Sequence, residues 1–210
     1  MHVGISGLEQ SQERPVAPVR GMAFGWLLLT LGSLGVAMAA VLLVEKVRIL
    51  QDPSYVPSCS INPILSCGSI MNTPQAEAFG FPNPIIGLAG FAVVATAGAA
   101  VIAGAQFARW FWRALLAGSA AGVVFVHWLI FQSLYRIGAL CPYCMVVWAV
   151  TIAVFWYTLL HVLASVTSDT TTPRWYRWTV SYHGVVLTGW FLAVGGLITV
   201  RFWYYWATLA

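Results

Sequence analysis

The four cysteines of this 210-residue chain form two pairs with different spacings and different surroundings. Cys59 and Cys67 lie eight residues apart in a proline-rich polar segment, whereas Cys141 and Cys144 form a C-x-x-C motif that opens an apolar run. A thiolate attacks a disulfide through a mixed-disulfide intermediate, so two such pairs in contact can pass electrons between them. The pattern therefore predicts thiol–disulfide exchange.

The C-x-x-C motif fits the start of a helix. Cys141 suits the N-cap, and Pro142 suits the first turn, where its missing N–H costs nothing. We expect the sulfur of Cys144 to lie near the free N–H groups at the positive end of the helix, which lowers the pKa of a thiol. An apolar oxidant such as a quinone would reach Cys144 from the lipid. A zinc site completed by Cys59 and Cys67, or inert structural cysteines, are the alternatives.

Polar residues and prolines surround the first cysteine pair. We predict that this setting keeps a Cys59–Cys67 disulfide mobile and accessible to a large protein partner. The alternative is a static disulfide that staples the loop, and this pair alone does not decide between them. Together with the C-x-x-C motif, an electron relay is the better interpretation. The residues that create the setting are Pro57, Ser58, Ser60, Asn62 and Pro63.

The composition indicates a membrane protein. Apolar residues make up 60% of the chain and charged residues 8%, and the mean hydropathy is +0.82, whereas soluble domains carry about 25% charged residues. Runs of about 20 apolar residues are long enough to cross a bilayer as helices. The sequence therefore predicts an all-α integral membrane protein with five transmembrane helices, at Met22–Val44, Pro84–Ala105, Phe111–Tyr135, Pro142–Val166 and Val185–Tyr205.

These helices define the predicted organisation. Residues 1–21 form a cytoplasmic tail, and residues 22–210 form a single transmembrane domain whose outer loop, about 49–83, carries the first cysteine pair. The orientation follows from the excess of basic residues expected in cytoplasmic loops. With the N-terminus inside, the cytoplasmic side holds Arg14, Arg20, Arg109, Arg113, Arg174 and Arg177, and the outer side holds Lys46, Arg48, Arg136 and Arg201.

This orientation places both cysteine pairs on the outer face of the membrane, in the oxidising compartment where disulfides persist. The formal charge of +4 is explained by the inner loops and gives no reason to expect a nucleic-acid partner.

Three further local patterns lead to expectations. A short helix from about Ile64 to Phe79 would start anew at Pro74, because proline cannot continue a helix. Gly118 and Gly122 form a G-x-x-x-G pair, which marks close helix packing. His127 lies inside a transmembrane helix, where an ionisable residue suggests function. It either delivers protons to a reduced quinone or, as we favour, is a neutral histidine bonded across the bundle.

The order and spacing of the cysteines resemble the vitamin K epoxide reductase (VKOR) family: two loop cysteines eight apart, then C-x-x-C at a helix start. The segment Asn83-Pro84-Ile85-Ile86-Gly87 looks like that family's Asn-x-x-x-Gly motif. The resemblance covers about residues 22–166 and implies a four-helix catalytic bundle, with a fifth helix added in bacterial members. The chain resembles the unfused actinobacterial type. Because the chain ends at Ala210 without the thioredoxin-like domain of many relatives, we expect a separate partner protein.

The resemblance also implies roles for the cysteines. Cys59 would exchange with the partner, and Cys67 would form the bridging disulfide with Cys141. Cys144 would face the quinone and form a charge-transfer adduct with it.

Three further residues are implied as quinone contacts. Asn83 would hydrogen-bond a quinone oxygen, although capping the second helix is an alternative role. Thr73 resembles a Ser/Thr position near the family's pocket. Trp148 stands where vertebrate members have a tyrosine that contacts the quinone. This departure puts epoxide reduction in doubt more than quinone reduction.

Together these features predict a membrane oxidoreductase that passes electrons from thiols to a quinone, menaquinone or ubiquinone, in the bacterial inner membrane. Its partner would be a secreted thioredoxin-fold (DsbA-like) protein that it reoxidises, which supports disulfide formation. One alternative is recycling of vitamin K quinone or its epoxide. An alternative of a different class is a non-catalytic membrane scaffold with two structural disulfides.

Overall fold

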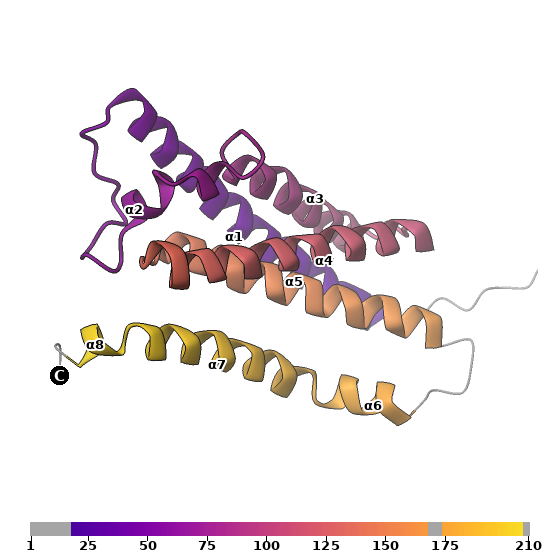
Figure 1. The fold of residues 1–210 in the computed structure, drawn as a ribbon. Helices are drawn as coiled ribbons and strands as arrows, with labels where there is room; N and C mark the ends of the chain where they lie inside the picture. The colour runs from indigo at the N-terminus through magenta and orange to yellow at the C-terminus, as the bar shows by residue number, and fades with distance from the viewer. Residues whose placement is uncertain (1–17, 168–173, 208–210) are drawn as a thin grey trace, which may run out of the picture.

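The computed structural model describes residues 18–167 and 174–207, and the regular structure in these ranges is helical (Figure 1). Within them, five helical stretches are long and apolar enough to cross a membrane: Gly21–Gln51, Pro84–Ile102, Arg109–Ile137, Pro142–Ser165 and His183–Arg201. The predicted fold class, an all-α integral membrane protein with five transmembrane helices, is confirmed. Most of the predicted cytoplasmic tail, residues 1–17, lies outside the described residues.

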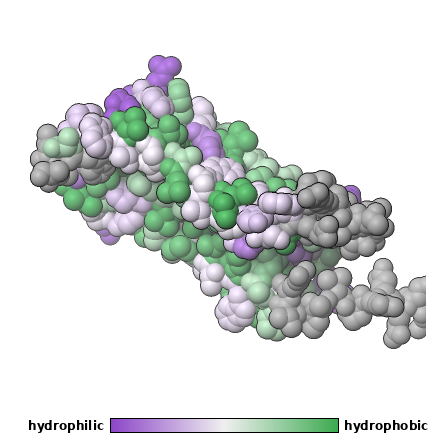
Figure 2. Space-filling model, turned by 90° about the horizontal axis from the view of Figure 1, so that it is seen from below, coloured by the Kyte–Doolittle hydropathy of each residue, from purple (hydrophilic) through white to green (hydrophobic). Residues whose placement is uncertain are grey.

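Four helices form a bundle, and a fifth lies beside it (Figure 1). The bundle consists of α1 (Pro18–Gln51), α3 (Pro84–Ile102), α4 (Arg109–Phe131) and α5 (Pro142–Thr167). The peripheral segments are α6 (Arg174–Ser181), α7 (His183–Arg201) and α8 (Trp203–Trp206). Figure 2 shows a face covered mainly by hydrophobic and weakly polar side chains, with the most hydrophilic ones toward its left end. This distribution suits a lipid environment.

The first helix is longer than predicted. α1 continues to Gln51, seven residues beyond the predicted end at Val44. Its last three turns carry Leu42, Glu45, Lys46 and Ile49, which are all buried. These positions follow the i, i+3, i+4, i+7 spacing that places side chains on one helix face. The extension therefore packs against the loop that carries the first cysteine pair.

Small residues set the closest helix crossing, between α1 and α3. A Cβ atom on Gly32 or on Gly98 would collide with the backbone of the facing helix. The predicted packing role is wrong for Gly118, where a Cβ would meet nothing within 4 Å. It agrees with the structure at Gly122, where a Cβ would lie only 3.3 Å from a methyl group of Thr151 on α5. Both of these α4 glycines also line a cavity inside the bundle.

The loop between α1 and α3 contains two short helical segments, α2 (Cys67–Met71) and the 3-10 helix η1 (Pro74–Glu77). The restart at Pro74 agrees with the prediction, but the first segment begins at Cys67 rather than at Ile64. The reason is the cap: the hydroxyl of Ser66 accepts a hydrogen bond from the N–H of Ser69 at 3.3 Å. An N-cap of this kind fixes where a helix begins.

Two backbone hydrogen bonds join this loop to the start of α5. The N–H of Ser66 donates to the carbonyl of Leu140 at 2.9 Å, and the N–H of Leu140 donates to the carbonyl of Ile64 at 2.7 Å. The chain arrives at this bridge from α4 through a π-helical segment, Gln132–Ile137, and a left-handed Gly138 with a φ of 73°. The bridge brings the first cysteine pair against the C-x-x-C motif.

The peripheral helix α7 is fastened to α4 by a histidine. The indole Nε1–H of Trp190 donates to Nε2 of His127 at 3.0 Å, and Nδ1 of His127 lies 2.8 Å from the carbonyl of Val123. A ring that accepts at Nε2 and donates at Nδ1 is the neutral tautomer. This geometry favours the structural interpretation of His127 over proton delivery.

Candidate functional site

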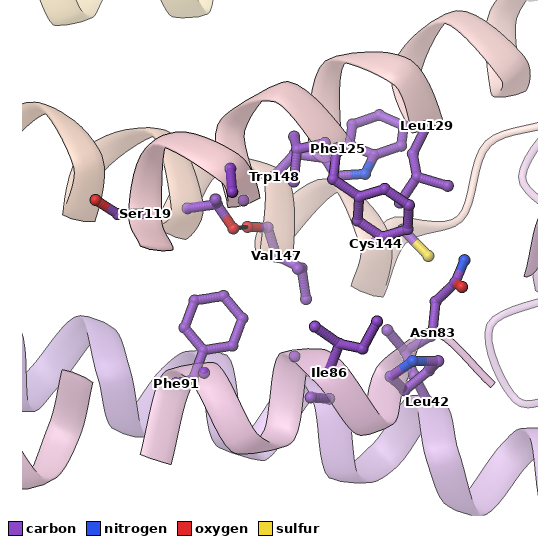
Figure 3. A pocket seen from close by; sticks show the side chains of 18 of the residues that line it. Leu42, Asn83, Ile86, Phe91, Ser119, Phe125, Leu129, Cys144, Val147 and Trp148 are labelled. Atoms are coloured by element: carbon purple, nitrogen blue, oxygen red, sulfur yellow. Dashed lines mark hydrogen bonds between the residues drawn. The ribbon is translucent and has the colours of Figure 1, made fainter. Parts of the chain in front are cut away.

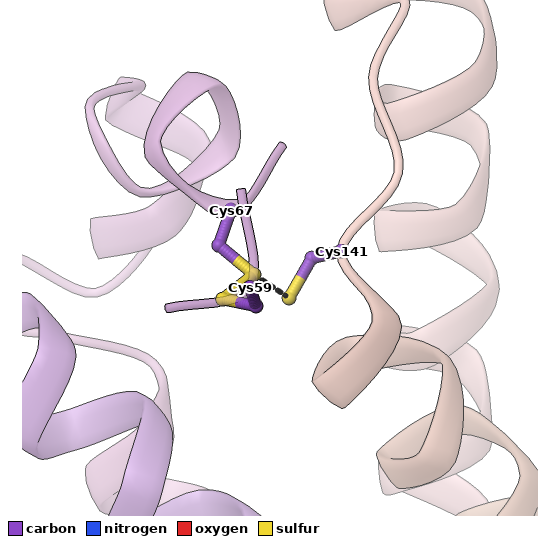
Figure 4. A group of neighbouring side chains, drawn as sticks. All are labelled: Cys59, Cys67 and Cys141. Carbon is purple, nitrogen blue, oxygen red and sulfur yellow. Dashed lines mark hydrogen bonds between the residues drawn. A yellow bond between two sulfur atoms is a disulfide. The ribbon is translucent and has the colours of Figure 1, made fainter. Parts of the chain in front are cut away.

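Three cysteine sulfurs meet at the junction of the loop and α5 (Figure 4). Cys59 and Cys67 form a disulfide, and the sulfur of Cys141 lies 3.0 Å from that of Cys67. All three sulfurs lie within 4.8 Å of one another. Cys141 and Cys144 are free thiols. A thiol thus lies directly beside a disulfide sulfur that it can attack.

The bonds among the three sulfurs suit thiol–disulfide exchange better than metal binding. Its distances alone would also suit three ligands of a metal ion. Zinc binds cysteine as the thiolate, and the sulfurs of Cys59 and Cys67 are already bonded to each other. The disulfide also confirms that the first pair is joined within the loop, as the sequence led us to expect.

Cys59 is less accessible than predicted. It is only 3% exposed, and Cys67 and Cys141 are fully buried. Ser58 is exposed and Ser60 is half-buried, but the hydroxyls of both form hydrogen bonds with other parts of the protein. The hydroxyl of Ser58 donates to Glu45 at 2.7 Å, and the hydroxyl of Ser60 accepts the N–H of Gly68 at 3.3 Å. The prediction of an exposed disulfide is therefore wrong for this conformation, and the Ser58–Ser60 segment must move before a partner can reach Cys59.

The start of α5 acts on the sulfur of Cys141. The backbone N–H of Cys144 donates to this sulfur at 3.3 Å. The hydrogen bond from the Cys144 side chain lowers the pKa of Cys141; burial opposes this, and the backbone N–H groups of Cys144 and Tyr143 add to the lowering. We expected the free N–H groups to act on Cys144. These N–H groups act on Cys141 because the side chain of an N-cap residue points at the free N–H groups of the first turn. The side chain of Cys144, at the third helical position, points away from them.

Cys144 also faces a different environment, an open-sided cavity of about 700 Å³ lined mainly by α1, α3, α4 and α5. Figure 3 shows its thiol and the amide of Asn83 both directed into this space. The rest of the lining is mostly apolar and includes Leu42, Ile86, Phe91, Phe125, Leu129, Val147 and Trp148. Apolar walls with a thiol and an amide suit a flat apolar molecule that carries acceptor oxygens, such as a quinone.

Asn83 organises one end of the cavity. Its side-chain oxygen accepts the N–H of Ala78 at 3.1 Å, and its amide nitrogen donates to the carbonyl of Gln75 at 2.7 Å. Its side chain makes no capping bond to α3, so the capping alternative is wrong. These two bonds hold η1 in place and leave the amide a second N–H hydrogen that can bond a ligand.

The two remaining predicted contacts differ in position. Trp148 lines the cavity and is 4% exposed. Thr73 does not belong to the lining, and its hydroxyl donates to the carbonyl of Ile70 at 2.7 Å. This hydroxyl closes a turn between α2 and η1, and Ile70, Met71 and Gln75 on either side of Thr73 line the cavity.

Two charged residues of α1, Glu45 and Lys46, lie beside the site and are not among the predicted site residues. The Nζ atom of Lys46 lies 2.9 Å from the carboxylate of Glu77 and donates to the carbonyl of Met71 at 2.7 Å. A signal was available in the helical spacing of Leu42, Glu45, Lys46 and Ile49, which carries two charges onto an apolar face.

Comparison with protein families gives one match. The model of the vitamin K epoxide reductase family matches residues 26–159, which is more than half of the chain. The matched region contains all four cysteines, Asn83, all of α3 and α4 and most of α1 and α5, and it ends before α7. No curated protein matches this chain.

Proposed function

This chain belongs to the vitamin K epoxide reductase family of membrane oxidoreductases, and we propose that it is a quinone-coupled thiol oxidase. In this function it reoxidises a secreted thioredoxin-fold protein and thereby supports disulfide formation. The observation that carries the proposal is the 3.0 Å separation between the sulfurs of Cys67 and Cys141. It links the loop disulfide to a second pair whose other member, Cys144, lines the apolar cavity.

The first stage is exchange between the partner and the loop. A partner thiolate attacks the sulfur of Cys59, and Cys67 leaves as a thiolate. The second partner thiol then closes the partner's own disulfide and releases Cys59. Two electrons have moved from the partner to the loop, which now holds two thiols.

The second stage moves these electrons to the C-x-x-C motif. Cys67 attacks Cys141 in the oxidised Cys141–Cys144 pair, and Cys144 leaves as the thiolate. Cys59 then attacks Cys67, which releases Cys141 and restores the loop disulfide. The products are a Cys59–Cys67 disulfide and two thiols at Cys141 and Cys144. This is the arrangement of bonds in the structure.

The third stage occurs at the cavity, where a bound quinone supplies an acceptor for two electrons and two protons. Cys144 is the sulfur that faces this space, and Asn83 has an N–H hydrogen to donate to an acceptor oxygen. Because the pKa of Cys141 is lowered, its thiol more readily forms the thiolate that closes the disulfide with Cys144.

The arrangement of the cysteines argues against the scaffold alternative. A scaffold held by two structural disulfides has no need for contact between its two cysteine pairs, whereas the sulfurs of Cys67 and Cys141 lie 3.0 Å apart. One thiol of this pair contacts the loop disulfide and the other lines a cavity. An arrangement of this kind suits transfer of electrons rather than fixed cross-linking.

We also propose that the protein lies in a bacterial inner membrane with its N-terminus in the cytoplasm and its cysteines on the outer face. The six inner and four outer basic residues of the predicted loops support this orientation. The hydrogen-bonded bridge between Ile64–Ser66 and Leu140 supports the placement of both cysteine pairs on the same side of the membrane.

The direct experiment is turnover of the full chain in lipid nanodiscs that contain menaquinone or ubiquinone. A reduced thioredoxin-fold protein is added, and quinone absorbance and partner thiols are followed together. We expect one quinone to be reduced for each partner disulfide formed. If neither the protein nor a small-molecule dithiol causes quinone reduction, the proposed function is wrong.

A further inference from the structure

One charged side chain reaches the apolar cavity. Among the described residues that line it, Lys46 is the only one with a charged side chain, and it is 6% exposed. Lys46 is also the only lysine of the chain, whose other nine basic residues are arginines. A buried charge within a membrane-spanning helix is expensive to maintain. Its position beside a site of electron transfer therefore suggests a function.

The contacts of Lys46 connect the cavity to water. Its Nζ atom donates to the carbonyl of Met71 at 2.7 Å and lies 2.9 Å from Oε1 of Glu77. The side chain of Glu77 is 38% exposed, whereas that of Lys46 is 8% exposed. The pair thus has one member that reaches solvent and one that reaches the cavity.

Other charged groups nearby are directed elsewhere. Glu45, the neighbour of Lys46 on α1, accepts the hydroxyl of Ser58 in the cysteine loop. Arg48 is exposed and donates to the hydroxyl of Tyr55 at 3.1 Å. Lys46 therefore pairs with Glu77, and it lines the same cavity as Asn83.

We propose that Lys46 is the proton donor of the cavity and that Glu77 resupplies it from water; this inference rests on the proposed quinone reduction. An ammonium group stabilises negative charge that develops on an acceptor oxygen, and it can transfer a proton there. Arginine would supply the charge without the proton, because it is not deprotonated in proteins.

The electrons and protons balance. Cys141 and Cys144 lose two electrons and two protons when they form their disulfide, and a quinone takes up two of each to become a quinol. Lys46 gives one proton to one oxygen, and the thiol of Cys144 supplies the other. Glu77 takes a proton from water and passes it to the neutral amine of Lys46, while the proton of Cys141 leaves to water.

The first test uses the uniqueness of this lysine. Incorporation of ¹⁵N-lysine into the full chain places a side-chain label at one site, Lys46. We expect titration with menadione in nanodiscs to shift this signal, in the wild-type protein and equally in Cys144→Ser, which binds without turnover. A salt bridge that only fastens η1 to α1 would leave the signal unchanged. An unchanged signal in protein that reduces menadione would contradict the proposal.

The second test is turnover of menadione with a small-molecule dithiol. Lys46→Met should reduce the rate by about 10²-fold, the usual contribution of a general acid. Lys46→Arg should retain the menadione affinity but not the rate. Arg48→Met removes a positive charge two residues away on the exposed side of α1 and is the control, with a normal rate. A normal rate in Lys46→Met, or full recovery in Lys46→Arg, would overturn proton donation by Lys46.

Glu77→Gln keeps the inference testable if Lys46→Met folds poorly, because Glu77 is partly exposed and Lys46 remains in place. We expect a slower rate and an increased solvent isotope effect, since reprotonation of Lys46 becomes limiting. An unchanged rate and isotope effect would contradict the relay. If the wild-type protein itself reduces no menadione, the proposed function fails; if it does and these variants match it, only this inference fails.

Discussion

The sulfur of Cys141 lies 3.0 Å from the sulfur of Cys67, which is already bonded to Cys59. In exchange, a Cys67–Cys141 bond would form and the Cys59–Cys67 bond would break, and the sulfurs of both bonds are already in contact. Cys144, three residues further along α5, packs against this junction and also lines the cavity. The two sulfurs of the C-x-x-C motif therefore have separate surroundings, and their substitution should have separate consequences.

Replacement of Cys144 by serine should abolish quinone reduction and leave exchange with the partner intact. The hydroxyl cannot form a disulfide with Cys141, whereas the contact between Cys67 and Cys141 does not involve Cys144. Quinone absorbance measures the first activity, and mass spectrometry of partner adducts measures the second. Quinone reduction at the wild-type rate in this variant would refute the assignment of Cys144.

Replacement of Cys59 by alanine should separate large from small reductants. A small dithiol should still drive quinone reduction, since movement of the Ser58–Ser60 segment is enough to admit it to Cys67 and Cys141 and it needs no loop disulfide. Turnover with a thioredoxin-fold protein should collapse, because the sulfur that receives the partner's attack is missing. Normal oxidation of the protein partner by this variant would show that Cys59 only staples the loop.

Ser58→Ala should make Cys59 easier to reach. It removes the 2.7 Å hydrogen bond to Glu45, whose other carboxylate oxygen already has no partner among the described residues. A buried acceptor left without its donor costs about 1–3 kcal/mol. We expect faster hydrogen exchange at residues 58–60 and faster reduction of the loop disulfide by a protein partner.

Ser54→Ala is the matched control for Ser58→Ala. Its hydroxyl also bonds a carboxylate, that of Asp52, but on the exposed surface. Equal behaviour of the two variants would mean that the bond to Glu45 does not hold the loop closed.

The pH dependence of exchange should follow the thiol of Cys141. Because its pKa is lowered, chiefly by the hydrogen bond from Cys144, the reactive thiolate persists to lower pH than for an ordinary cysteine. Cys144→Ala removes that bond, so the pKa of Cys141 should rise. The stopped-flow rate of Cys67–Cys141 exchange should then fall off at a higher pH than in Cys144→Ser. A profile at the same or a lower pH would contradict this role of the Cys144 side chain.

Much of the fold was predictable because its signals are local. An apolar run long enough to cross a bilayer has few structural solutions, and the four cysteines mark the redox chemistry by spacing alone. The start of α5 was equally clear, since Pro142 fixes a first turn. These features need no knowledge of which segments meet in space.

The rest depends on contacts between distant segments. The pair of Lys46 and Glu77 joins residues from α1 and η1, and nothing near either residue indicates the other. The burial of Cys59 depends on the hydrogen bond that Ser58 donates to Glu45, a residue of α1. Gly32 and Gly98 pack against a neighbouring helix and Gly118 does not. The sequence does not distinguish them, because it does not show which helix lies opposite each glycine.

The most direct measurement of the central claim is disulfide mapping of Cys59→Ala after reduction and a single oxidation by quinone, with acid quenching. Without Cys59 to resolve it, the mixed disulfide between loop and motif should accumulate. We predict a peptide linkage between Cys67 and Cys141, with Cys144 recovered as a free thiol. Recovery of Cys67 as a free thiol, or of a Cys67–Cys144 linkage in place of Cys67–Cys141, would contradict the relay.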